Sequence, residues 1–245
     1  MGRIVQKRFV RKLDLEKLLL QIKPHPMPKP DLEQYTISAE TAATMLYIAA
    51  YTNDDIIGKK ILDLGCGTGR LALGAAYLGA KQVVGVDIDK TAVRSAYENS
   101  VQAGLKTKTQ WINADINVVR GRFDTVLQNP PFGIQTIHAD LKFLKKAVET
   151  GKRIYSFHKG SCNDSTFRKT LNSKSISPIP TAPTLFLKKF IEKNGGEIRG
   201  VYAMNMSIPH MFNFHTKRKH TFVIDLYVIE TKTDQDSLTR HQKVY

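Results

Sequence analysis

The stretch KILDLGCGTGRLALGAAYLGA, residues 60–80, joins an apolar run to a helical pattern through three closely spaced glycines. Glycine lets the backbone turn sharply and approach a ligand closely at the carboxyl end of a parallel strand. Asp87 ends the next apolar run, 20 residues after Gly67. A carboxylate at that place accepts hydrogen bonds from a ribose diol in nucleotide sites. The stretch therefore predicts a nucleotide-type crevice at the edge of a sheet.

Short apolar runs alternate with helical segments on both sides of this stretch, from residue 60 to residue 157. Parallel strands need helical crossovers, and buried parallel strands read as continuous apolar runs. We therefore expect a doubly wound, Rossmann-like α/β fold. Its sheet should have seven strands, mostly parallel, with a C-terminal antiparallel hairpin. The expected strands are residues 60–64, 82–88, 109–116, 123–129, 153–157, 196–206 and 220–230.

The ends of the chain differ from this central part. Leucines in residues 11–22 favour one helical face, and the proline-rich stretch KPHPMPKP, residues 23–30, must end that helix. Ser38 is a suitable N-cap for a further helix over residues 38–52. We expect a basic N-terminal helix and linker (1–30), a catalytic domain (31–232) and a polar tail (233–245).

The charge of the chain favours a polyanionic partner. Lys and Arg number 37 against 22 Asp and Glu, for a formal net charge of +15. An acidic membrane surface, or solubility alone, would also fit this charge. Two cysteines, Cys66 and Cys162, are too few for a disulfide framework or a zinc site made of Cys alone. The sequence shows no signal-peptide core or membrane-length apolar run, so we expect a cytoplasmic protein and no membrane partner.

The glycine loop resembles two kinds of nucleotide site. A nicotinamide dehydrogenase would need a third glycine of the GxGxxG pattern where Arg70 stands. Asp63 leads the loop instead, as in S-adenosylmethionine sites, where an acid beside the glycine turn serves the methionine end. Asp115 ends the third apolar run and is placed to receive an adenine amino group. The alternative is a tight turn with aspartates that merely cap strand ends.

The sequence NPPFG, residues 129–133, directly follows the fourth expected strand. An exocyclic amino nitrogen is a poor nucleophile until acceptors draw on its hydrogens. The Asn129 oxygen and the Pro130 carbonyl are two such acceptors, and the prolines keep them fixed. Phe132 offers a face on which a flipped base can stack. We expect no metal and no nucleophilic side chain, because a sulfonium already carries a good leaving group. A proline-stiffened turn with a core phenylalanine is the alternative.

Together, DLGCGTG, VDID and NPPFG resemble the amino-methyltransferases that act on adenine N6, cytosine N4 or glutamine N5. The motifs LEQY (32–35), YSFHK (155–159) and FNFHTKRK (212–219) narrow the resemblance to the methyltransferase-like protein five group, including archaeal-type members. This group comprises adenine N6-methyltransferases of small-subunit ribosomal RNA, and the likeness covers most of residues 30–230. It implies a class I methyltransferase that uses S-adenosylmethionine on structured RNA. It also implies a small zinc-binding activator protein as a partner.

The motifs and the resemblance give three sets of candidate residues. The resemblance implies that Gln34 and Tyr35 close over the cofactor. The predicted catalytic residues are Asn129, Pro130, Pro131 and Phe132. The predicted cofactor contacts are Gln34, Tyr35, Asp63, Gly65, Cys66, Gly67, Gly69, Asp87, Ile88, Asp115, Ile116 and Asn129. The predicted RNA contacts are His158, Lys159, Phe214, His215, Lys217, Arg218 and Lys219, and no metal ligand is expected.

Two departures from the group bear on these sets. Thr36-Ile37 stands where Pro-Thr often follows LEQY, so no cofactor contact is assigned to either residue. Residues 161–183 look like an insertion, which we expect to be a surface loop. Two other functions stay open: a protein glutamine N5-methyltransferase, and a non-catalytic RNA-binding ribosome-assembly factor that keeps the fold.

Overall fold

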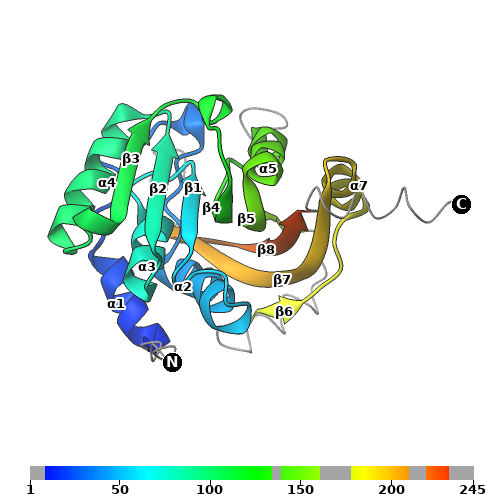
Figure 1. Ribbon diagram of the computed structural model, residues 1–245, viewed down its shortest axis with the longest axis horizontal. Helices are drawn as coiled ribbons and strands as arrows, with labels where there is room; N and C mark the ends of the chain where they lie inside the picture. Colours follow the sequence, from blue (N-terminus) through cyan, green and yellow to red (C-terminus); the bar gives the residue numbers. More distant parts are fainter. Residues whose placement is uncertain (1–8, 134–138, 161–177, 210–218, 232–245) are drawn as a thin grey trace, which may run out of the picture.

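One eight-stranded sheet forms the centre of the computed structural model, which describes residues 9–133, 139–160, 178–209 and 219–231. The strand order is β3-β2-β1-β4-β5-β8-β7-β6 (Figure 1). Strands β1 to β5 are parallel, and β8, β7 and β6 are added antiparallel. The strands are β1 (Lys60–Leu64), β2 (Gln82–Asp87), β3 (Thr109–Asn113), β4 (Phe123–Gln128), β5 (Gly151–Lys159), β6 (Ile179–Pro180), β7 (Gly196–Pro209) and β8 (Lys219–Thr231). The predicted Rossmann-like sheet with its C-terminal antiparallel hairpin is confirmed.

The number of strands differs from the seven that the sequence predicts. Ile179–Pro180 forms an edge strand, β6, in the stretch expected to be a surface loop. Pro180 tolerates this place because an edge strand does not need every N–H. The next residue, Thr181, donates its N–H to the Val201 carbonyl at 2.9 Å. A two-residue strand that contains proline is too short to show a pattern. The other residues of the expected insertion, 161–177, lie outside the described part.

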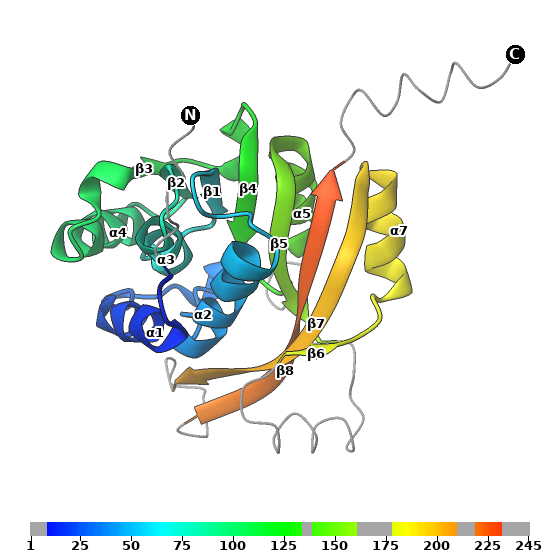
Figure 2. The ribbon, with the colours of Figure 1, turned by 60° about the horizontal axis from the view of Figure 1, so that its bottom comes forward.

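Helices cover both faces of the sheet. Helices α1, α2 and α3 pack together on one face, and α5 and α7 lie on the other (Figures 1 and 2). The helices are α1 (Lys12–Gln21), α2 (Ala39–Tyr47), α3 (Arg70–Leu78), α4 (Lys90–Gln102), α5 (Ala139–Thr150) and α7 (Leu185–Lys193). Shorter helical turns are η1 (Pro30–Leu32), η2 (Ile48–Thr52), η3 (Lys106–Lys108) and η4 (Ile116–Val118). No helix in these described ranges is long and apolar enough to cross a membrane.

The N-terminal helix belongs to the main hydrophobic core. Leu15 and Leu19 of α1 are fully buried against α2 and α3. Gly74 of α3 permits this contact, because a Cβ there would lie 2.3 Å from Leu46 Cδ1 and 3.2 Å from Leu19 Cδ2. The predicted cap is also confirmed, since Ser38 Oγ accepts the Thr41 N–H at 3.1 Å. Both ends of the segment between α1 and α2 are therefore fixed to the core.

Trp111 of β3 fills the space beneath the glycine loop. A Cβ on Gly85 of β2 would lie 2.5 Å from Trp111 Cζ3 and 3.0 Å from Cys66 Sγ. A Cβ on Gly69 would lie 2.6 Å from Trp111 Cη2. The indole thus needs glycine on both the strand and the loop, and it supports the loop from below.

Gly85→Ala should reduce the free energy of unfolding by about 1 to 3 kcal/mol, because it overpacks a rigid indole ring. Urea unfolding monitored by circular dichroism measures this change. The cost should be smaller when Trp111→Leu is already present. An equal cost in both backgrounds would show that the clash with the indole is not the cause.

Candidate active site

A cavity of about 280 Å³ opens at the carboxyl edge of the parallel strands. Strand β1 lies there between β2 and β4, so the strand order reverses, and ligands of open α/β sheets bind at such a point. At this edge it is lined by Asp63 of β1 and Asp87 of β2, and by Asp115 and Asn129, which come shortly after β3 and β4. All the predicted cofactor contacts except Gly69 line it: Gln34, Tyr35, Asp63, Gly65, Cys66, Gly67, Asp87, Ile88, Asp115, Ile116 and Asn129.

The glycine loop depends on backbone angles that other residues rarely adopt. Gly65, Gly67 and Gly69 have φ values of 68°, 53° and 88°. The Gly67 N–H donates to Asp87 Oδ2 at 2.8 Å, which ties the loop to the end of β2. A Cβ on Gly65 would lie 2.8 Å from the Phe143 ring of α5. Gly69 precedes α3 and faces Trp111, so it serves packing, and its contact with the cofactor stays a prediction.

Asp63 is the most enclosed acid of the cavity, with 1% of its surface exposed. Its Oδ2 accepts the Ala72 N–H at 2.9 Å, while Oδ1 has no hydrogen-bond partner among the described residues. Burial raises the pKa of Asp63 to about 7; the Ala72 bond opposes this rise and the nearby Asp87 charge adds to it. A buried carboxylate with one uncompensated oxygen is suited to receive a cationic group.

The two other strand-end acids are held by backbone donors. Asp87 accepts the Gly67 N–H and, at 2.9 Å, the Asp89 N–H. Burial raises the pKa of Asp87, and these two bonds oppose the rise. Asp115 is exposed and caps η4 by accepting the Asn117 N–H at 2.7 Å. The three acids thus lie around one cavity, each oriented by its own backbone contact.

The predicted reactive loop, residues 129–132, lies at the end of β4 beside the cavity. Asn129 Oδ1 is buried and has no hydrogen-bond partner in the part of the chain that the structure describes. Asn129 and Pro131 line the cavity, whereas Pro130 is buried behind it. The Phe132 ring packs edge-to-face on Phe222 of β8, with the ring centroids 5.9 Å apart. The loop therefore presents an unused acceptor to the cavity.

A buried chain of polar side chains lies beneath this loop. Gln128 Nε2 donates to Ser156 Oγ at 2.8 Å, and Ser156 Oγ lies 2.8 Å from His158 Nε2. His158 Nδ1 is 3.6 Å from Asp140 Oδ2, at the start of α5. Only 2% of the His158 side chain is exposed, and its ring nitrogens face Ser156 and Asp140. The structure thus shows the imidazole facing the interior, and its predicted contact with RNA stays a prediction.

The other predicted RNA contacts are only partly described. Lys159 is exposed at the end of β5, and Lys219 begins β8. Four of them lie outside the described residues: Phe214, His215, Lys217 and Arg218.

The remaining wall of the cavity comes from residues 23–37, which we call the arm. Two core side chains hold its ends. Arg70 donates to the carbonyls of Ile37 and Ile22, the latter at 3.3 Å. Asn99 pairs with the backbone of Lys23 in both directions, at 3.1 and 3.2 Å. Arg70, which breaks the GxGxxG pattern, thus fixes the arm over the loop that it follows.

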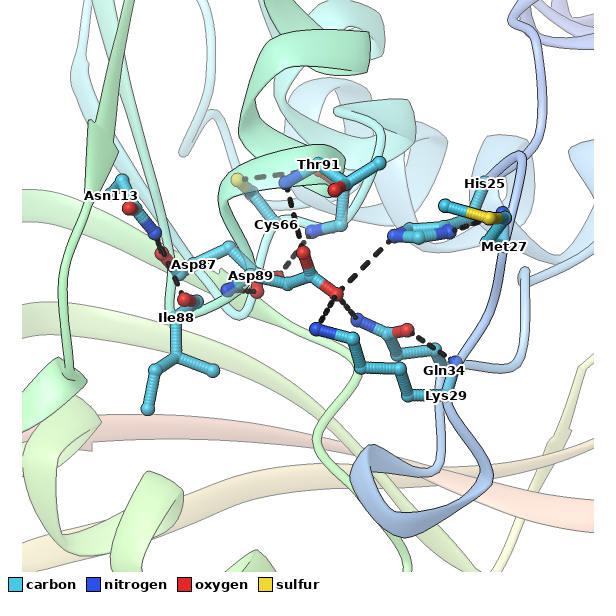
Figure 3. A network of polar contacts seen from close by, with 11 residues as sticks. His25, Met27, Lys29, Gln34, Cys66, Asp87, Ile88, Asp89, Thr91 and Asn113 are labelled. Carbon is cyan, nitrogen blue, oxygen red and sulfur yellow. Dashed lines mark hydrogen bonds and ion pairs between the residues drawn. The ribbon is translucent and has the colours of Figure 1, made fainter.

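Asp89 holds the middle of the arm (Figure 3). Its Oδ2 lies 3.0 Å from Gln34 Nε2, 3.2 Å from Lys29 Nζ and 3.4 Å from His25 Nε2. Burial acts to raise the pKa of Asp89, but hydrogen bonds from Gln34, Thr91 and Lys29 outweigh it and lower the pKa to about 2. Gln34 therefore lines the cavity while its amide joins the arm to the core.

Sequence reasoning missed several residues of the cavity wall. Thr36 and Ile37, to which no contact was assigned, both line the cavity, as do Glu33 and Phe143. Glu33 lies within LEQY, Thr36 and Ile37 directly follow it, and Phe143 lies on an ordinary helix face, so no stronger local signal marks these residues. Within the described residues, no group of three His, Cys, Asp or Glu side chains is arranged to hold a metal ion.

The reversed strand order, the glycine loop with its acids and the Asn-Pro-Pro-Phe loop define a Rossmann-like methyltransferase. A family described as the methyltransferase small domain matches residues 40–155. The rRNA N(6)-adenosine-methyltransferase METTL5 of Danio rerio is 37% identical, over 86% of this chain and 95% of that protein. An uncharacterized protein of Methanocaldococcus jannaschii is 35% identical, over 91% of this chain and 95% of that protein.

A solved structure of a Pyrococcus horikoshii protein, described as an RNA methyltransferase, is similar over 92% of this chain and all of that one. Its TM-score is 0.75 and its sequence is 34% identical. The chain belongs to the METTL5 family of rRNA N(6)-adenosine-methyltransferases.

Arg70→Ala should leave the carbonyls of Ile22 and Ile37, at the two ends of the arm, without their donor and reduce the free energy of unfolding by about 2 kcal/mol. Chymotrypsin should then cut the arm faster after Leu32 and Tyr35, which mass spectrometry of timed digests measures. Arg94→Ala is the matched control, because the contact that Arg94 makes in the described part of the chain is an exposed ion pair with Glu98 on α4. Equal cleavage rates in the two variants would contradict the role of Arg70.

Proposed function

We propose that this chain transfers a methyl group from S-adenosylmethionine to the N6 amino group of an adenosine in structured RNA, with small-subunit ribosomal RNA as the substrate. The observation that carries this proposal is the buried Asn129 Oδ1, which has no hydrogen-bond partner among the described residues and lies at the side of an acidic cavity. Membership of the METTL5 family supports the reaction and the class of substrate.

The residues of the cavity fit this cofactor. Asp63 Oδ1 is buried and unpaired within the described chain, and it would receive the ammonium group of the methionine end. Asp87 would bind the ribose hydroxyls and Asp115 the adenine amino group, with Ile88 and Ile116 beside the ring. Gln34 and Tyr35 of the arm would cover the cofactor, and the glycine loop allows its close approach.

When bound, the cofactor supplies a methyl group on a positively charged sulfur. The protein's task is then to orient the target amine in line with that methyl group. Asn129 Oδ1 and the Pro130 carbonyl would accept the two hydrogens of the amine, which turns its lone pair toward the methyl carbon. These acceptors become more favourable as positive charge develops on nitrogen. Phe132, supported by Phe222, would stack against the base.

The proposed partners follow from the charge and the family. A net charge of +15 favours the RNA backbone, and Lys159, with the cluster Phe214, His215, Lys217, Arg218 and Lys219, would contact it. His158 stays a predicted RNA contact, although its imidazole is buried beneath the reactive loop. A small zinc-binding activator protein is a further proposed partner, and we place the reaction on ribosomal subunits in the cytoplasm.

The direct test is transfer of labelled methyl from S-adenosylmethionine to purified ribosomal subunits and their extracted RNA, followed by nucleoside analysis. Asn129→Ala should lower kcat by about 100-fold or more, because it removes a preorganised acceptor. Asn194→Ala, which only alters the end of α7, should leave activity unchanged. Label on protein would support a glutamine methyltransferase. Cofactor binding without any transfer would instead support the non-catalytic assembly factor.

Cofactor affinity should depend on pH through Asp63. Its pKa of about 7 in the free protein means that the carboxyl group is protonated below neutrality and cannot compensate an ammonium charge. The dissociation constant should therefore fall as pH rises from 5.5 to 7. Titration calorimetry of the wild type and of Asp63→Asn measures this. The variant should bind more weakly and with a flatter pH profile, and an equal slope in both proteins would exclude Asp63 as the source.

A further inference from the structure

Glu33 is an acid of the cavity wall to which no role has yet been assigned. It follows η1 in the arm, and 6% of its surface is exposed. Its Oε2 accepts the Phe132 N–H at 2.7 Å. This hydrogen bond joins the arm to the reactive loop across 99 residues of sequence. Glu33 is thus in direct contact with the segment that carries the acceptors for the target amine.

The backbone of Glu33 is held in an uncommon conformation. Its φ and ψ are 48° and 42°, in the left-handed region that residues other than glycine seldom adopt. Two tight contacts maintain it: the Glu33 N–H donates to the Pro30 carbonyl at 2.8 Å, and the Tyr35 N–H donates to the Glu33 carbonyl at 2.7 Å. Such strain persists only where surrounding contacts enforce it, and it concentrates at functional sites. The turn directs a buried carboxylate at the loop.

The choice of Phe132 as donor follows from the sequence of the loop. Pro130 and Pro131 have no N–H, so after Asn129 the first backbone donor available to hold the loop is that of Phe132. A hydrogen bond from a backbone N–H to a carboxylate is stronger than one to a neutral acceptor in the same place. The bond from Glu33 therefore fixes the far end of the two-proline segment, while β4 fixes the near end.

The arm that carries Glu33 is itself anchored. The next residue, Gln34, is bonded to Asp89, and Arg70 and Asn99 hold the ends of the arm. The position of the loop relative to the cofactor cavity is thus set by a chain of contacts that runs from the core through the arm to Phe132.

We propose that Glu33 is a positioning residue for methyl transfer, which holds Asn129 and Pro130 in register with the cofactor by anchoring the Phe132 amide. This inference rests on the proposed function. A displacement of the acceptors of about 1 Å is enough to lower a rate by about 100-fold. The loss of Glu33 should lower kcat rather than the affinity for the cofactor, because the loop that it anchors would bind the target base.

The test compares Glu33→Ala with Glu33→Gln, which keeps an acceptor oxygen of nearly the same shape. Glu40→Ala is the matched control, since Glu40 is exposed on the first turn of α2. We expect Glu33→Ala to lower kcat on RNA by about 10- to 100-fold, with the dissociation constant for S-adenosylmethionine changed less than about threefold. Glu33→Gln should recover most of kcat, and thermal melts should confirm that all variants are folded at the assay temperature.

Amide hydrogen exchange of the peptide that contains Phe132 gives a readout that does not need activity. Exchange there should be faster in Glu33→Ala than in the wild type or in Glu40→Ala. Unchanged exchange and kcat would overturn the proposal. An equal loss of kcat in Glu33→Ala and Glu33→Gln, with a matching loss of cofactor affinity, would also overturn it and make Glu33 a cofactor contact. Wild type that makes no N6-methyladenosine would refute the proposed function, whereas the exchange result would still decide whether Glu33 anchors the loop.

Discussion

Strand β1 has β2 on one side and β4 on the other, and the connections that follow these strands run to opposite faces of the sheet. The two faces separate at the carboxyl end of β1, and an opening must form there. Every chemical group of the site depends on this constraint. The glycine loop leaves β1, Asp87 ends β2, and Asn129 follows β4, so the reversal brings the cofactor wall and the reactive loop to one place.

Two oxygens in this opening are left without hydrogen-bond partners by the described chain: Asp63 Oδ1 and Asn129 Oδ1. Proteins satisfy most buried polar atoms, so such exceptions mark places where a ligand completes the structure. One belongs to an acid whose pKa burial raises, and the other to an amide that cannot ionise. The first suits a group that is already cationic when it binds, such as an ammonium, and the second suits an amine that gains charge only during the reaction.

Much of this arrangement could be predicted from local patterns. The apolar runs predicted the strands, and the spacing of Gly67 and Asp87 predicted the crevice, because both features depend on residues that are close in the sequence. The contacts of the arm could not be predicted in this way. Asn99 is 76 residues from Lys23, and Arg70 is 48 residues from Ile22, so no periodicity connects them. The burial of His158 could not be predicted either, because it depends on the pairing of β5 with β8 and on Asp140 of α5. Nor could the close approach of Trp111 to Gly69 be predicted, because Trp111 is 42 residues away in the sequence.

Arg70, Asn99 and Asp89 hold the arm against the core through contacts within the chain itself. The conformational entropy lost in ordering it is therefore lost when the chain folds, and cofactor binding does not have to compensate for it. A preorganised wall of this kind would contact the ribose, the adenine and the amino acid end of the cofactor, none of which changes when the methyl group leaves. The demethylated product would keep those contacts, so the rate of product release, rather than closure of the arm, would set how soon the next cycle begins.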